Sequence, residues 1–62
     1  MKFRILRDYD EYRPQVWVEP KGKLPYWEDI GMYRCEFIES AEEVCVQYKR
    51  MIENPIVKEF EL

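Results

Sequence analysis

Residues 40–54, SAEEVCVQYKRMIEN, form the stretch of sequence that decides the fold. Its apolar side chains recur at spacings of three and four residues, which places them on one side of a helix. These side chains are Ala41, Val44, Cys45, Tyr48, Met51 and Ile52. Ser40 and Glu43 have the spacing of a capping box, and Asn54-Pro55 is a stop signal because proline cannot continue a helix. The sequence therefore predicts a helix over 40–54 that covers an apolar surface.

Four other segments alternate in polarity as β-strands do. They are residues 2–7, 12–19, 33–39 and 56–62. A polar turn joins the first two segments into a predicted hairpin. Pro14 lacks a backbone N–H, so we expect it at the start of its strand or on a free edge. Residues 20–31 contain two prolines and two glycines and are expected to form a long connecting loop.

These elements predict one α+β domain over residues 1–62, with the order β-β-β-α-β. The first three strands should form an antiparallel meander with the helix packed on one face. The last strand should return beside the first by a right-handed crossover. The other sheet face would then stay exposed and carry an aromatic and partly basic surface. Its expected members are Trp17, Lys2, Arg4, Gln15 and Arg34.

The composition disfavours catalysis and metal binding. The chain has no histidine and no threonine, and its one serine is the expected helix cap, so the usual general base and nucleophile pairs are missing. Two cysteines without histidine cannot complete a zinc tetrahedron within one chain. We therefore expect no enzyme activity, no catalytic or metal site and no cofactor.

Charge and hydropathy also limit the setting of the protein. The net charge of −3 and the pI near 4.9 count against general nucleic-acid binding. No apolar run approaches the roughly 20 residues that span a bilayer, so we expect no membrane association and a cytoplasmic protein. Cys35 and Cys45 fit buried thiols in such a compartment, with a disulfide between them as the alternative.

Aromatic side chains are the best candidates for a partner-binding site, because tryptophan, tyrosine and arginine are enriched at interface hot spots. The candidate residues are Trp17, Tyr26, Trp27, Tyr12 and Arg34. For Trp27 two interpretations stay open, a lid folded over the core and an interface residue.

Residues 37–43, FIESAEE, run from the expected third strand into an acidic capped helix. This segment resembles the three-stranded DNA-binding domains at the N-terminus of tyrosine-type integrases, although those domains are typically basic and lack a strand after the helix. The small, acidic, aromatic-rich chain as a whole is also similar to small orphan proteins of bacteriophages and mobile elements. That resemblance implies a protein that binds and inhibits a host protein.

Three hypotheses about function follow. The first is a non-enzymatic protein-binding module, including a phage-type regulator or inhibitor, that uses residues 20–31 and the Trp17 face or an edge strand. The alternative is nucleic-acid binding through the exposed sheet face, with Lys2, Arg4, Arg34 and Trp17 as contacts. The third is a homodimer that buries this face against a second copy.

Overall fold

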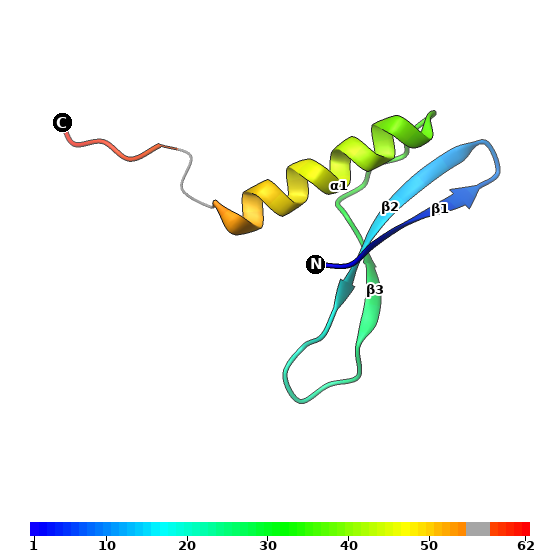
Figure 1. Cartoon of the computed structure of the whole chain (residues 1–62), viewed down its shortest axis with the longest axis horizontal. Coiled ribbons are helices and arrows are strands. Elements are labelled where there is room, and N and C mark those ends of the chain that lie inside the picture. The colour runs from blue at the N-terminus through cyan, green and yellow to red at the C-terminus, as the bar shows by residue number, and fades with distance from the viewer. Residues whose placement is uncertain (55–57) are drawn as a thin grey trace.

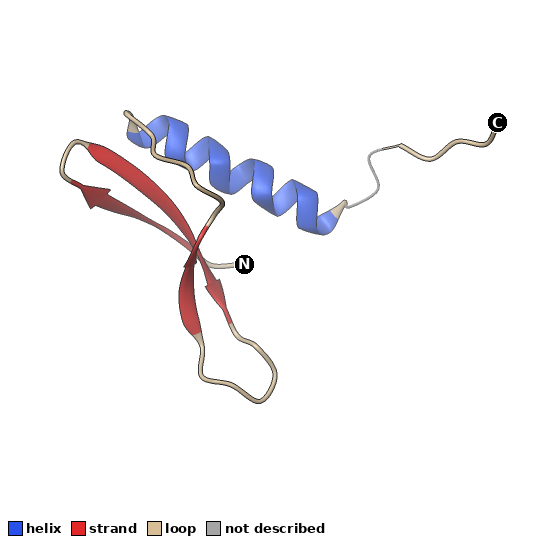
Figure 2. Ribbon diagram, turned by 180° about the vertical axis from the view of Figure 1, so that it is seen from behind, coloured by secondary structure: helices blue, strands red, loops and turns tan. Residues whose placement is uncertain are grey.

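The computed structural model describes residues 1–54 and 58–62 and contains three strands followed by one helix (Figure 1). The strands are β1, Phe3–Asp8; β2, Glu11–Val18; and β3, Tyr26–Asp29; the helix is α1, Ile38–Glu53. The sheet has the order β1-β2-β3 with both pairs antiparallel. The helix lies across one face of this sheet (Figure 2). The predicted α+β class, with an antiparallel meander and one helix on one face, is confirmed.

The core lies between β2 and α1 and is small. Val16 of β2, Ile30 after β3 and Cys45 of α1 are its buried members, and partly buried hydrophobic side chains surround them. These surrounding residues are Phe3, Val18, Val44 and Tyr48. Because side chains alternate along a strand, the burial of Val16 under the helix places Gln15 and Trp17 on the opposite, open face.

The predicted hairpin of the first two strands is confirmed, with bounds shifted by one residue. Tyr9 and Asp10 make the turn between β1 and β2. Tyr9 has a φ of +60°, and among the described residues it is the only one other than glycine with a positive φ. A positive φ at the first turn position suits the right-handed twist of a hairpin, but it is normally supplied by glycine.

The predicted third strand at residues 33–39 is wrong. The third strand is β3, within the expected loop 20–31, and Cys35 makes an isolated bridge to Tyr12 with backbone hydrogen bonds of 2.7 and 2.9 Å. The register of β3 sets Trp27 opposite Trp17. Contact between these two rings favours pairing of this short segment, and local polarity does not reveal such a contact.

The expected position of Pro14 is also wrong, because it lies inside the central strand β2 and is fully buried. Ile30 donates a backbone hydrogen bond of 3.0 Å to the Pro14 carbonyl, immediately after β3 ends. The missing Pro14 N–H therefore faces the point where β3 stops pairing. A central strand tolerates proline here because one neighbour has ended.

The helix begins earlier than predicted, at Ile38, and Ser40 does not cap it. Phe37 is the N-cap residue in extended backbone, without a side-chain cap hydrogen bond. The first helical turn closes where Ala41 N–H donates to the Phe37 carbonyl at 3.3 Å. Glu43 does not reach back to Ser40; its Oε1 accepts a hydrogen bond of 2.7 Å from Gln47 Nε2. The residues after Cys35 are free of the sheet, so they can extend the helix by two residues.

The helix ends at Glu53 with Asn54 as C-cap, as predicted. Its last turn extends past the sheet, so Met51 and Ile52 are exposed although both were expected on the buried face (Figure 1). Of the predicted final strand at 56–62, residues 56 and 57 lie outside the described residues. Residues 58–62 have no regular secondary structure, so that part of the prediction is wrong.

Candidate functional site

A pair of tryptophans dominates the open sheet face. Trp17 of β2 and Trp27 of β3 are direct cross-strand partners, with ring centroids 5.2 Å apart and planes tilted by 59°. Both side chains are half-buried. The rings cover each other in part and present the rest to solvent, so Trp27 is not a lid over the core between the sheet and α1.

Two cations lie on these rings, Arg4 of β1 and Lys2 immediately before that strand. Lys2 Nζ lies 5.4 Å from the Trp17 ring centroid and 5.7 Å from that of Trp27. The Arg4 Cζ lies 4.4 Å from the Trp27 centroid. These are cation–π distances. The antiparallel pairing with β2 sets both cations beside the rings. Trp17 N–H donates to the Lys2 carbonyl at 2.9 Å, and Arg4 lies opposite Gln15.

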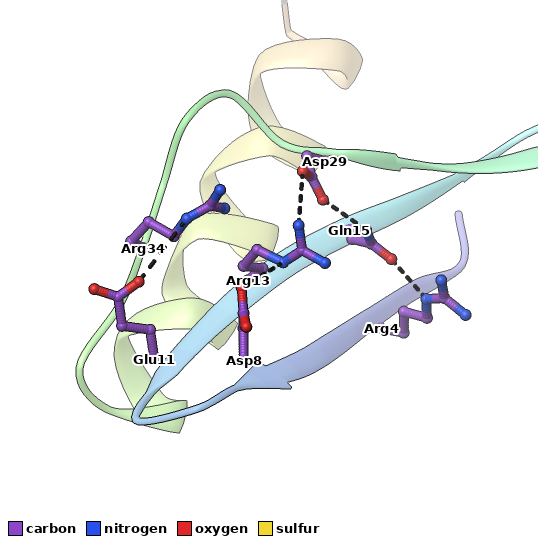
Figure 3. A network of polar contacts seen from close by, with 7 residues as sticks. All are labelled: Arg4, Asp8, Glu11, Arg13, Gln15, Asp29 and Arg34. Carbon is purple, nitrogen blue, oxygen red and sulfur yellow. Dashed lines mark hydrogen bonds and ion pairs between the residues drawn. The ribbon is translucent and has the colours of Figure 1, made fainter.

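A chain of polar contacts holds Arg4 in place (Figure 3). Arg4 Nε donates to Gln15 Oε1 at 2.7 Å, and Gln15 Nε2 donates to Asp29 Oδ1 at 2.6 Å. Asp29 Oδ2 lies 3.5 Å from Arg13 Nη1, and Arg13 Nε lies 4.0 Å from Asp8 Oδ2. Gln15 is 6% exposed, and an unpaired amide would be costly at such a buried position. Its oxygen and its nitrogen each have a hydrogen-bond partner. The chain fixes the guanidinium before any partner arrives.

The charges of the open face nearly cancel. Carboxylates border the aromatic–cationic cluster of Trp17, Trp27, Lys2 and Arg4: Asp29 is in the polar chain, and Glu19 Oε1 accepts a hydrogen bond of 2.8 Å from Trp17 Nε1. Anionic ligands therefore meet acidic as well as basic groups at this surface. Flat aromatic area, and not net charge, is what the cluster offers a partner.

The structure brings together two of the five predicted site residues, Trp17 and Trp27. Tyr26 is exposed but lies opposite Val18, so alternation sets it on the helix side of β3. Tyr12 shares the face of Val16. Arg34 lies in the segment after β3, with its Nε 3.9 Å from Glu11 Oε2, and does not join the cluster (Figure 3).

Arg13 and Asp29 are the site-supporting residues that sequence reasoning missed. Arg13 follows from the alternation that already set Gln15 and Trp17 on one face. Asp29 could be found only with β3 assigned correctly, because its place opposite Gln15 depends on that register.

A second surface is an apolar groove of about 370 Å³ between α1 and the segment that follows β3. Ile30, Tyr33, Val44, Tyr48 and Met51 contribute its apolar lining. The tail of the helix beyond the sheet leaves this groove open. It adds to the apolar area that the domain exposes.

Both thiols are buried, and that of Cys45 is a poor nucleophile. Cys35 and Cys45 are free and buried, as the primary interpretation of the sequence held. Burial raises the pKa of the Cys45 thiol, and the nearby Cys35 and Glu42 raise it further. A thiol that stays protonated is a poor nucleophile. Within residues 1–54 and 58–62, no three metal-binding side chains gather into a site.

No protein-family model matches the chain, and neither the curated proteins nor the solved structures contain a significant match to it. Over the described part of the chain, no helix has the length and apolar character needed to cross a membrane.

Proposed function

We propose that this protein is a non-enzymatic protein-binding module whose open sheet face, centred on Trp17 and Trp27, contacts the partner. The carrying observation is the tryptophan pair, half-buried on a face that the helix leaves uncovered and held by Lys2 and Arg4. Aromatic residues and arginine are the groups that contribute most to protein interfaces. A preformed cluster also loses little side-chain freedom on binding.

The exposed area of the chain supports a partner. A compact monomer of 7.7 kDa exposes about 4,300 Å², whereas this chain exposes 5630 Å². The extended residues 58–62 contribute to the excess, and so do apolar side chains of the domain. Among these are Met32, Phe37, Met51 and Ile52, all more than half exposed.

Nucleic-acid binding is a second candidate, favoured by Lys2 and Arg4 beside stacked aromatic rings. Proteins bind single-stranded nucleic acid with this combination, because bases stack on the aromatic rings and phosphates bind the cations. Two features disfavour it. The cations already occupy ring faces, and Glu19 and Asp29 would repel phosphates. The experiment below separates the two candidates.

The test is affinity capture from a lysate of the source or its host, at low and moderate salt, with proteins and nucleic acids both recovered. We expect one protein that binds the wild type at moderate salt and is lost with Trp17→Ala and with Trp27→Ala. Both side chains lie outside the core between the sheet and α1, so circular dichroism should find the helix retained in both variants.

Tyr26→Ala is the matched control, since it removes an aromatic ring from the same strand on the opposite face. It should retain the partner. Equal recovery by all variants would rule out the tryptophan face as the site. Recovery of nucleic acid that declines as salt rises, without a protein partner, would favour the second candidate.

A further inference from the structure

The outer side of β1 is an unpaired strand edge. Trp17 N–H donates to the Lys2 carbonyl, so these residues form a hydrogen-bonded pair, and alternate residues of β1 point their backbone groups away from β2. Phe3, Ile5 and Arg7 are these outward residues. In the described chain β1 pairs with β2 alone. Such an edge can accept an additional strand.

The two faces of this edge differ in chemistry. On the helix side, Phe3 and Ile5 line a hollow of about 360 Å³ together with Cys45 and Glu42 of α1 and with Arg4. On the open side, Lys2 and Arg4 are exposed. An added strand that suits the edge would carry apolar side chains on one face and acidic side chains on the other.

Residues 58–62, KEFEL, have this pattern. Phe60 and Leu62 share one side of an extended chain with Lys58, whose Nζ lies 4.6 Å from the Phe60 ring centroid, and Glu59 and Glu61 share the other. In the structure Phe60 is 66% exposed and Leu62 is fully exposed. Five extended residues span roughly 17 Å, which fits along the six residues of β1.

We propose that residues 58–62 of a second copy of this chain add as a strand to the outer edge of β1, and that the exchange is reciprocal in a dimer. The proposed register sets Phe60 and Leu62 beside Phe3 and Ile5, where they cover the hollow. Glu59 and Glu61 then lie beside Lys2 and Arg4. Strand addition is an established mode of recognition, and exchange of an identical element between protomers is a low-cost route to dimers.

The occupant is a second copy because the segment leads away from its own sheet. Both views place the C-terminus far from β1 (Figures 1 and 2). Exchange therefore requires no rearrangement of the described domain. This proposal concerns the outer edge of β1, whereas the proposed function concerns the tryptophan face. Lys2 and Arg4 border both surfaces.

The first measurement is the mass of the full chain by light scattering over a wide concentration range. We expect a shift from the monomer mass of 7.7 kDa to twice that mass, and a monomer at all these concentrations for Phe60→Asp/Leu62→Asp. Neither side chain packs in the described core, so the double variant should fold.

Charge reversal tests the register. Glu59→Lys/Glu61→Lys should weaken the dimer about tenfold or more, because each exchanged strand then sets like charges beside Lys2 and Arg4. Combining it with Lys2→Glu/Arg4→Glu should restore the dimer. Glu36→Lys/Glu39→Lys, which makes the same change in net charge at exposed positions, should leave the dimer intact.

Hydrogen exchange gives a direct readout, since the outward amides of Phe3 and Ile5 should gain protection as the dimer forms. A monomer at every concentration overturns the proposal. So does a dimer that the Phe60 and Leu62 substitutions leave unchanged. Protection of these amides in a monomer would mean that the chain's own segment occupies the edge, which also overturns exchange between copies.

Discussion

Tyr9 carries a side chain at a backbone conformation that usually belongs to glycine. Its φ of +60° sets the Cβ against the following carbonyl, a strain of about 1–2 kcal/mol in the left-handed region. The ring is 91% exposed, so packing offsets little of this cost. Arg7 Nε donates a hydrogen bond of 3.2 Å to the Tyr9 carbonyl, which involves the backbone of Tyr9 and not its ring.

Tyr9→Gly should therefore stabilise the domain. We expect a gain of about 0.5–1 kcal/mol in the free energy of unfolding, after allowing for the greater freedom of glycine in the unfolded chain. Urea titration measures it. Tyr9→Ala is the control, since it keeps the Cβ and should gain little. Equal gains from both substitutions would locate the effect in the exposed ring and not in the backbone.

Among single residues, sequence could predict those whose surroundings follow from their own strand. The alternation of β2 places Trp17 and Gln15 on the open face and Val16 under the helix, and the structure agrees. Arg34 and Tyr26 were misplaced because their position depends on where the third strand runs. That depends on contacts across the sheet, which the local pattern does not contain.

At the level of elements, the helix was the strongest prediction and its start was the weakest part of it. The capping-box spacing of Ser40 and Glu43 is present, yet α1 begins at Ile38. Its first turn has acidic Glu39 but no side chain that accepts from the free N–H groups. Local sequence indicates where a helix can begin, and the release of the preceding chain from the sheet decides where it does.

A cap at the observed start should be stabilising. Phe37→Ser supplies a hydroxyl acceptor at the N-cap, and Phe37 is 60% exposed, so we expect a gain of up to about 1 kcal/mol. Phe37→Ala removes the ring without adding a cap and serves as the control. Ser40→Ala should change stability by less than about 0.5 kcal/mol. A loss near 1 kcal/mol for Ser40→Ala, measured by thermal or urea unfolding, would instead place the start of the helix at Ser40.

The sheet illustrates the same limit. The first hairpin was predictable because two alternating runs flank a short polar turn. β3 was not, because YWED is short, does not alternate and follows Pro25. Pro14 was predicted at the start of its strand or on a free edge because it has no N–H for the ladder. In the structure it lies in the central strand, and the neighbouring strand β3 ends beside it.

For the whole molecule, a small core holds an extended chain. The Cα radius of gyration is 14.1 Å, whereas roughly 10.6 Å is usual for a compact domain of 62 residues. Val16, Ile30 and Cys45 are the buried members of the core between sheet and helix. Stability should depend strongly on keeping each of them apolar.

The pKa of Cys45 makes this core sensitive to alkaline pH. Desolvation raises the pKa of the folded thiol above its ordinary value of 9.0, so the unfolded chain loses this proton at lower pH than the folded one. The contribution of this thiol to the free energy of unfolding is fully present below about pH 9, and it is lost as the pH rises through the folded pKa. Unfolding titrations from about pH 8 to about pH 10.5 should find a steeper decline in the wild type than in Cys45→Ala. Equal slopes would mean that the thiol ionises alike in both states.

The tryptophan pair also gives the molecule a built-in optical reporter. The chain has two tryptophans, and both lie in the cluster on the open face. Its intrinsic tryptophan emission therefore originates at this one surface and at no other. Two indoles with centroids 5.2 Å apart are close enough for their excited states to couple, so the far-ultraviolet dichroism should contain an exciton signal as well as the backbone bands. A ligand that separates the rings or displaces Lys2 from them would change emission and exciton signal together, without any label.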